Sequence, residues 1–126
     1  MDDEIKSFIL HDDTAKQMVQ FADNLANDIW KDVSTSQIRN VYGTVKKLEM
    51  QREFDSKAYR QLLLLKPKLA YARGRAEPRK KPSFEQLEHA LGTAIDTVSL
   101  QEPETFKRFC HFFEAILAYH KAHGGK

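Results

Sequence analysis

Residues 103–122 read PETFKRFCHFFEAILAYHKA and show the clearest periodicity in the chain. Pro103 suits the first turn of a helix, where its missing N–H would have no partner. Apolar side chains then recur every three or four residues, which is the spacing of one helix face. That face consists of Phe106, Phe109, Phe113, Ile116 and Leu117. Gly124 and Gly125 are typical of a helix end. The stretch therefore predicts a long amphipathic helix with one buried stripe.

Two earlier segments have the same period. The first covers 14–29, with apolar residues from Ala15 to Ile29 three and four positions apart. Its start can be capped by Asp12, Asp13 or Thr14. The break at 34–36 (Ser-Thr-Ser) offers the N-cap of a second helix that we expect to run to about Glu53. Gly43 lies inside this second helix, and a close approach by a neighbouring backbone would explain it.

The secondary structure of the segment from Lys57 to Arg75, which contains a proline, can be interpreted in two ways. Its run of four leucines is compatible with a buried strand, but the Ala-rich continuation favours a helix. Pro67 removes one backbone donor and should kink or break that helix near Lys66. Residues 76–82, AEPRKKP, form the one clear loop, and this loop is strongly basic.

A further helix follows the basic loop. Ser83 and Gln86 are spaced as a capping box, and the apolar face extends to Val98. Residues 1–11 show little pattern beyond Phe8-Ile9-Leu10, so we expect them to be loosely ordered or to tuck against the domain. The fold class is all-α, and residues 1–126 are predicted to form a single compact bundle of about five helices, with a kink or break near Pro67.

Composition excludes several classes of protein. At 126 residues the chain has the size of one domain, and 41% apolar residues suffice for a core. We expect no membrane association and a cytoplasmic location, because no run reaches the about 20 apolar residues of a membrane span and the acidic start is not that of a signal peptide. Cys110 is the only cysteine, which excludes an internal disulfide, and we expect it to be a small buried hydrophobe.

No catalytic or metal-binding pattern stands out. His11-Asp12 is similar to the metal-binding pair of phosphohydrolases, but its place before a helix favours a cap. Two helical pairs have the spacing of metal ligands without an obvious third ligand, namely His111 with Glu114 and His120 with His123. We therefore expect no enzyme activity, no catalytic residues, no metal and no cofactor.

The small net charge of +2 hides an uneven distribution. Residues 1–45 carry four Lys/Arg against eight Asp/Glu, residues 46–81 carry twelve against four, and residues 82–126 carry four against six. A basic middle between acidic flanks indicates a surface for a polyanion, most plausibly a phosphate backbone. The acidic flanks could meet basic surfaces of neighbouring copies of the chain.

The basic residues of the middle region have helical spacing. Two stripes repeat a cation–tyrosine–cation pattern, Arg39-Tyr42-Lys46 and Lys68-Tyr71-Arg75, and Arg60 extends the second. Further cations flank them, namely Lys47, Arg52, Lys66 and Arg73. Such cations can contact successive phosphates of RNA, and Tyr42 or Tyr71 can stack on a base or ribose. Alternatively, the two tyrosines lie at the edge of the core. The alternative function for the whole chain is that of a helical protein–protein adaptor with no direct nucleic-acid role.

Three segments together resemble a known family: QIRNVYGTVKKLE at 37–49, LLLLKPKLAYARGR at 62–75 and FKRFCHFFEAILAYHK at 106–121. They are similar to the small helical subunit of type III-A (Csm-type) CRISPR-Cas effector complexes, and the resemblance covers roughly residues 34–123. The most specific part is KPKLAYA-x-GR followed by the Phe-rich ending.

The resemblance implies a non-catalytic RNA-binding subunit that acts in antiviral defence. Several copies would stack beside the backbone subunits and line the channel that holds the duplex of crRNA and target RNA, while cleavage belongs to other subunits. The implied partners are crRNA, target RNA, other copies of the chain, and the backbone and large subunits. The family's RNA-facing basic residues correspond to Arg39, Lys46 or Lys47, Lys68, Arg73 and Arg75.

Overall fold

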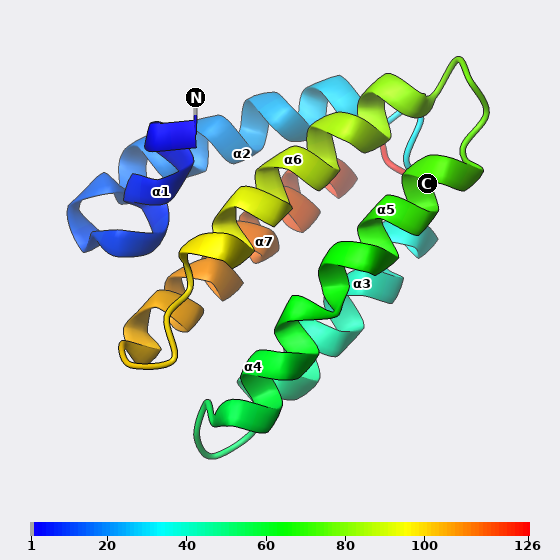
Figure 1. Cartoon of the computed structure of the whole chain (residues 1–126). Coiled ribbons are helices and arrows are strands. Elements are labelled where there is room, and N and C mark those ends of the chain that lie inside the picture. The colour runs from blue at the N-terminus through cyan, green and yellow to red at the C-terminus, as the bar shows by residue number, and fades with distance from the viewer. Residues whose placement is uncertain (1) are drawn as a thin grey trace.

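The computed structural model describes residues 2–126, and their regular secondary structure is helical (Figure 1). The helices are α1 (Asp2–Leu10), α2 (Ala15–Ile29), α3 (Thr35–Glu49), α4 (Ser56–Leu63), α5 (Leu65–Arg75), α6 (Lys81–Thr97) and α7 (Pro103–Ala122). A short 3-10 helix, Asp12–Thr14, joins α1 to α2. The all-α prediction is confirmed. With α4 and α5 taken as one bent segment, every predicted helix is present, and α1 is an addition.

Helix α7 occupies the middle of the bundle. It packs against α2, α3, α1 and α6, and α5 packs against α6 (Figure 1). Pro103 begins α7 and Gly124 follows its end with φ +115°, as the sequence predicted. The predicted stripe is buried except for Leu117, which is half-buried. Phe112 is also fully buried, because α7 has neighbours on more than one side.

Helix α1 decides between the two expectations for residues 1–11, because residues 2–10 are helical and pack against the domain rather than being loosely ordered. Ile5, Phe8 and Ile9 lie on one face of α1 and are almost completely buried. Phe8 contacts Phe21 of α2 and Phe112 of α7, with ring centroids 5.6 and 5.7 Å apart. A nine-residue helix has little stability alone, so tertiary packing accounts for α1; Ile5, Phe8 and Ile9 have helical spacing, but the segment is too short for that spacing to predict a stable helix by itself.

The break between α4 and α5 confirms the effect expected of Pro67. The interruption lies at Leu64, between Leu63 and Leu65. Pro67 has no N–H to donate to the carbonyl four residues earlier, which is that of Leu63, and its ring would clash with the same carbonyl in a continuous helix. Placed in the first turn of α5, the proline leaves no intrahelical bond unmade.

Two serines stand three residues before a glutamine, and their outcomes differ: the N-cap predicted at 34–36 is part of a full capping box, whereas the capping box predicted for Ser83 and Gln86 is absent. The Ser34 hydroxyl accepts from the Gln37 N–H at 3.1 Å and the Gln37 side chain accepts from the Ser34 N–H at 2.9 Å, so the first box is present. The second box is wrong: α6 starts earlier, at Lys81, with Pro82 in its first turn. There the Ser83 hydroxyl donates to the Asp32 carboxylate at 2.6 Å.

Three smaller expectations also fail. Helix α3 ends at Glu49 rather than near Glu53, and Asp55 then caps α4 by accepting from the Ala58 N–H at 2.9 Å. No side chain caps α2; the Thr14 hydroxyl instead donates to the Ser7 carbonyl at 2.9 Å. A Cβ built at Gly43 would meet nothing within 4 Å, so close backbone packing does not explain this glycine.

Candidate nucleic-acid interface

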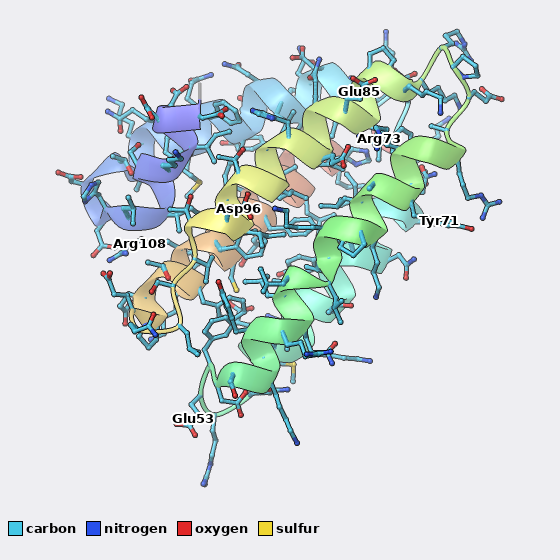
Figure 2. All side chains as sticks on the ribbon, viewed as in Figure 1. Glu53, Tyr71, Arg73, Glu85, Asp96 and Arg108 are labelled. Atoms are coloured by element: carbon cyan, nitrogen blue, oxygen red, sulfur yellow. The ribbon has the colours of Figure 1, made fainter. Side chains whose placement is uncertain are left out.

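Helix α5 separates the candidate cations into two groups. At about 3.6 residues per turn, Lys66 and Arg73 share one side of the helix, and Lys68, Tyr71 and Arg75 share the opposite side. The first group faces α6 and the second lies beside α3. Figure 2 shows this division: Arg73 lies between α5 and α6, while Tyr71 points away from α6.

The surface between α3 and α5 is an open groove that gathers polar and basic groups. This α3–α5 groove is lined by Gln37, Asn40, Val41, Pro67, Lys68, Tyr71, Ala72, Arg75 and Ala76. The lining has two cations and no carboxylate. Within residues 2–126, no ion pair joins Lys68 or Arg75 to an Asp or Glu. Both cations are therefore available to a ligand.

Tyr71 and Arg75 form a small recognition unit within the groove. Tyr71 is 65% exposed, although it is a large aromatic residue. The Arg75 guanidinium lies 5.6 Å from the Tyr71 ring centroid, and its Nη1 donates to the Tyr71 hydroxyl at 3.3 Å. A cation held at an exposed ring suits a ligand that is both anionic and aromatic, such as a nucleotide.

The surface between α5 and α6 has the opposite character. This α5–α6 groove is lined by Lys66, Leu69, Arg73, Glu85, Glu88, His89, Gly92, Thr93 and Asp96. The Lys66 Nζ lies 2.5 Å from Asp96 Oδ1, and the Arg73 Nη1 lies 2.8 Å from Glu88 Oε1. Two of the eight predicted RNA-binding cations therefore have carboxylate partners on another helix. The helical spacing within α5 could not reveal these ion pairs, because the acids come from α6.

Arg39, Tyr42 and Lys46 lie on a different side of α3 from the α3–α5 groove. Arg39 and Lys46 are exposed, and Lys46 pairs with Glu49 at 3.3 Å, which raises the pKa of its ammonium group. Tyr42 between them packs edge-on against Phe113, with centroids 5.3 Å apart. Burial, followed by the Glu114 carboxylate, raises the pKa of the Tyr42 hydroxyl. Tyr42 thus occupies the edge of the core, the alternative that the sequence left open.

The remaining basic residues of the middle region lie outside the two grooves. Lys47 is near the end of α3, and Arg52 lies in the connection to α4. In the basic loop, Arg79 and Lys80 approach Glu77 at 3.7 and 3.8 Å. Lys81 donates to the carbonyls of Arg73 and Gly74, at 3.1 and 3.0 Å, and so satisfies the end of α5.

Sequence reasoning missed the polar side chains that α3 contributes to the groove. Gln37 and Asn40 line it opposite Lys68 and Arg75, and their amides can both donate and accept hydrogen bonds. Their spacing of one turn on α3 can be seen in the sequence. Only the contact between α3 and α5 shows that both side chains line a groove.

Three of the side chains considered as ligands, Asp12, His120 and His123, have partners in the fold. Asp12 accepts from Arg108 Nε at 2.6 Å, and this bond lowers the pKa of the Asp12 carboxyl. His123 lies 2.6 Å from Asp23, and buried His120 donates from Nε2 to the Val33 carbonyl at 2.6 Å. Within residues 2–126, no three His, Cys, Asp or Glu side chains are grouped so that they could hold a metal ion.

Cys110 has the environment predicted for it. The side chain is completely buried in the phenylalanine-rich core, and burial raises the pKa of its thiol to about 12. None of the helices in residues 2–126 has both the length and the apolar character needed to cross a membrane.

Comparison with known proteins gives one result. Neither the comparison with curated proteins nor that with solved structures produced a match. The family model described as Csm2 Type III-A matches residues 12–126, which is nearly the whole chain and includes both grooves. The chain therefore belongs to the Csm2 Type III-A family, whose members are small subunits of type III-A Csm CRISPR-Cas complexes.

Proposed function

We propose that this chain is a non-catalytic structural subunit that binds the RNA backbone through the α3–α5 groove. The observation that carries the proposal is the pair of exposed, unpaired cations, Lys68 and Arg75, on either side of exposed Tyr71. The groove has no carboxylate that would repel a phosphate. Membership of a family of Csm complex subunits supplies the RNA context.

The groove suits contact with RNA that does not depend on base sequence. Lys68 and Arg75 are seven residues apart, so their Cα atoms are separated by about 10 Å along the helix. Each cation can contact a phosphate, and Tyr71 between them can stack on a base or ribose. Exposed Arg39, Lys46, Lys47 and Arg52 supply further cations on α3 and its C-terminal connection, and of these Lys46 also pairs with Glu49.

One copy of the chain offers few phosphate contacts. Several copies stacked along the duplex of crRNA and target RNA would add their contacts, so affinity in the assembled complex would exceed that of a single chain. The acidic segments at 1–45 and 82–126 would meet the basic surfaces of neighbouring copies. In this arrangement the chain supplies shape and charge, and other subunits carry out catalysis.

The test reverses the charges of the groove in the assembled complex. We expect the double variant Lys68→Glu/Arg75→Glu to weaken target-RNA binding and to make it less dependent on salt. Each lost phosphate contact reduces the magnitude of the slope of log K against log salt by about 0.7 for a single strand. The matched control is Lys6→Glu/Lys16→Glu, which changes the net charge equally at exposed positions of α1 and α2. Equal binding by wild type, variant and control would favour the protein–protein adaptor instead.

A further inference from the structure

Helix α5 carries two pairs of cations with the same spacing. Lys66 and Arg73 are seven residues apart on the side of α6, and Lys68 and Arg75 are seven residues apart on the side of α3. Taken alone, α5 would offer phosphate the same geometry on both sides. Apart from Tyr71, which lies on the α3 side, the difference between the two sides comes from the neighbouring helices.

On the α6 side, each cation meets a carboxylate. Glu88 and Asp96 lie eight residues apart on α6, and they pair with Arg73 at 2.8 Å and with Lys66 at 2.5 Å respectively. Glu85 adds a third carboxylate to the same groove, so its lining holds three acids beside Lys66, Arg73 and His89, whereas the α3–α5 groove holds two cations and no acid.

We propose that Glu88 and Asp96 determine the face of α5 on which this protein binds RNA, by keeping Arg73 and Lys66 neutralised on the other face. This inference rests on the function proposed above. The two acids are specificity-determining residues that need not touch RNA themselves.

The physical reason is competition for the same cations. A phosphate entering the α5–α6 groove would have to displace a carboxylate from Lys66 or Arg73 and would then lie beside that displaced charge. It would also release no condensed counterion at a cation already neutralised by the protein, and counterion release is the main source of non-specific RNA affinity. Neither cost arises at Lys68 and Arg75.

These ion pairs are poorly suited to a purely stabilising role. The side chains of Lys66 and Asp96 are 42% and 57% exposed, and those of Arg73 and Glu88 are 43% and 24% exposed. Exposed pairs contribute little to stability because water and salt screen them. Their effect on the surface potential remains, since removing the two carboxylates leaves two cations free in the groove.

The experiment neutralises the acids without changing their shape. The full-length double variant Glu88→Gln/Asp96→Asn is titrated with a fluorescent single-stranded RNA of mixed sequence at several salt concentrations. We expect tighter binding at low salt. Two added phosphate contacts should also make the drop in affinity between about 50 and about 200 mM salt about sevenfold larger than that of the wild type. The matched control is Asp13→Asn/Asp28→Asn, which removes two exposed carboxylates from the short 3-10 helix and from α2 and should change the affinity little.

A combined variant separates failure of this inference from failure of the proposed function. We expect Glu88→Gln/Asp96→Asn to restore part of the RNA binding lost in Lys68→Glu/Arg75→Glu, because the second face then becomes available. If the groove variant alone has no effect on binding, the proposed function is wrong. If the groove variant does weaken binding but neutralising the two acids changes affinity no more than the control does, the inference about α6 is overturned. Asp96→Asn alone, at the more exposed pair, repeats the test should the double variant fold poorly.

Discussion

Cys110 shows how strongly the core controls the chemistry of one side chain. Its thiol is surrounded by the core of α7, and burial raises its pKa from 9.0 to about 12, with a smaller contribution from the Glu49 carboxylate. The same thiol in the unfolded chain would ionise near its ordinary value. Native Cys110 is thus a neutral apolar group over the whole range in which an exposed cysteine becomes a nucleophile.

This difference predicts that the protein loses stability at alkaline pH. Above about pH 9 the unfolded state releases the thiol proton while the folded state keeps it, so the free energy of unfolding should fall by up to about 1.4 kcal/mol per pH unit until the pH reaches the folded pKa. Urea titrations of wild type and Cys110→Ala between pH 8 and about pH 10.5 measure this fall in the free energy of unfolding. The alanine variant is less stable throughout but should lack this part of the slope; parallel curves for the two proteins would contradict the prediction.

The candidate site shows where residue-by-residue prediction stops. Lys66 and Lys68 have similar surroundings in the sequence, and so do Arg73 and Arg75, and all four were predicted to bind RNA. The structure gives Lys66 and Arg73 partners from α6 and leaves Lys68 and Arg75 unpaired. Burial of Cys110 follows from its local pattern of phenylalanines, whereas ion pairing depends on which helix lies opposite, and one sequence contains no signal for that.

Ser34 and Ser83 show the same limit in the helices that they begin. Each serine has a glutamine three residues later, which is the capping-box spacing. Ser34 forms the box, but Pro82 allows α6 to start before Ser83, so the second hydroxyl is inside the helix and donates to Asp32 instead. The periodicity of the helices and the effects of the prolines on helix ends were predictable because both are local. The tertiary hydrogen bond from Ser83 to Asp32 was not.

A double-mutant cycle distinguishes the two roles. We expect Ser34→Ala to cost about 1 kcal/mol of stability through the lost cap. Ser83→Ala should also destabilise, but its cost should be strongly reduced in an Asp32→Ala background, because the 2.6 Å bond is already absent there. Urea unfolding of the four proteins of the cycle gives the coupling energy. Additive effects of Ser83→Ala and Asp32→Ala would show that the serine acts as a local cap after all.

Helix α1 completes the bundle, which is one of the two expectations that the sequence left open for residues 1–11. The family match begins at residue 12, yet Ile5, Phe8 and Ile9 cover part of α2, α6 and α7. Arg108 of α7 secures the end of α1 by donating to the Ile9 carbonyl at 3.1 Å and to Asp12 at 2.6 Å. The core of the matched region is therefore closed by a segment outside the match.

The closing role of α1 predicts a large effect from three side chains. Replacing buried Ile or Phe by Ala costs about 2–5 kcal/mol each, and the total stability of a domain is about 5–15 kcal/mol, so Ile5→Ala/Phe8→Ala/Ile9→Ala should lose most of its stability. The matched control places three alanines at exposed positions of the same helix, Asp3→Ala/Lys6→Ala/Leu10→Ala. Thermal unfolding followed by circular dichroism measures both. If the two variants melt within a few degrees of each other, α1 is an appendage and the remaining helices form the complete core.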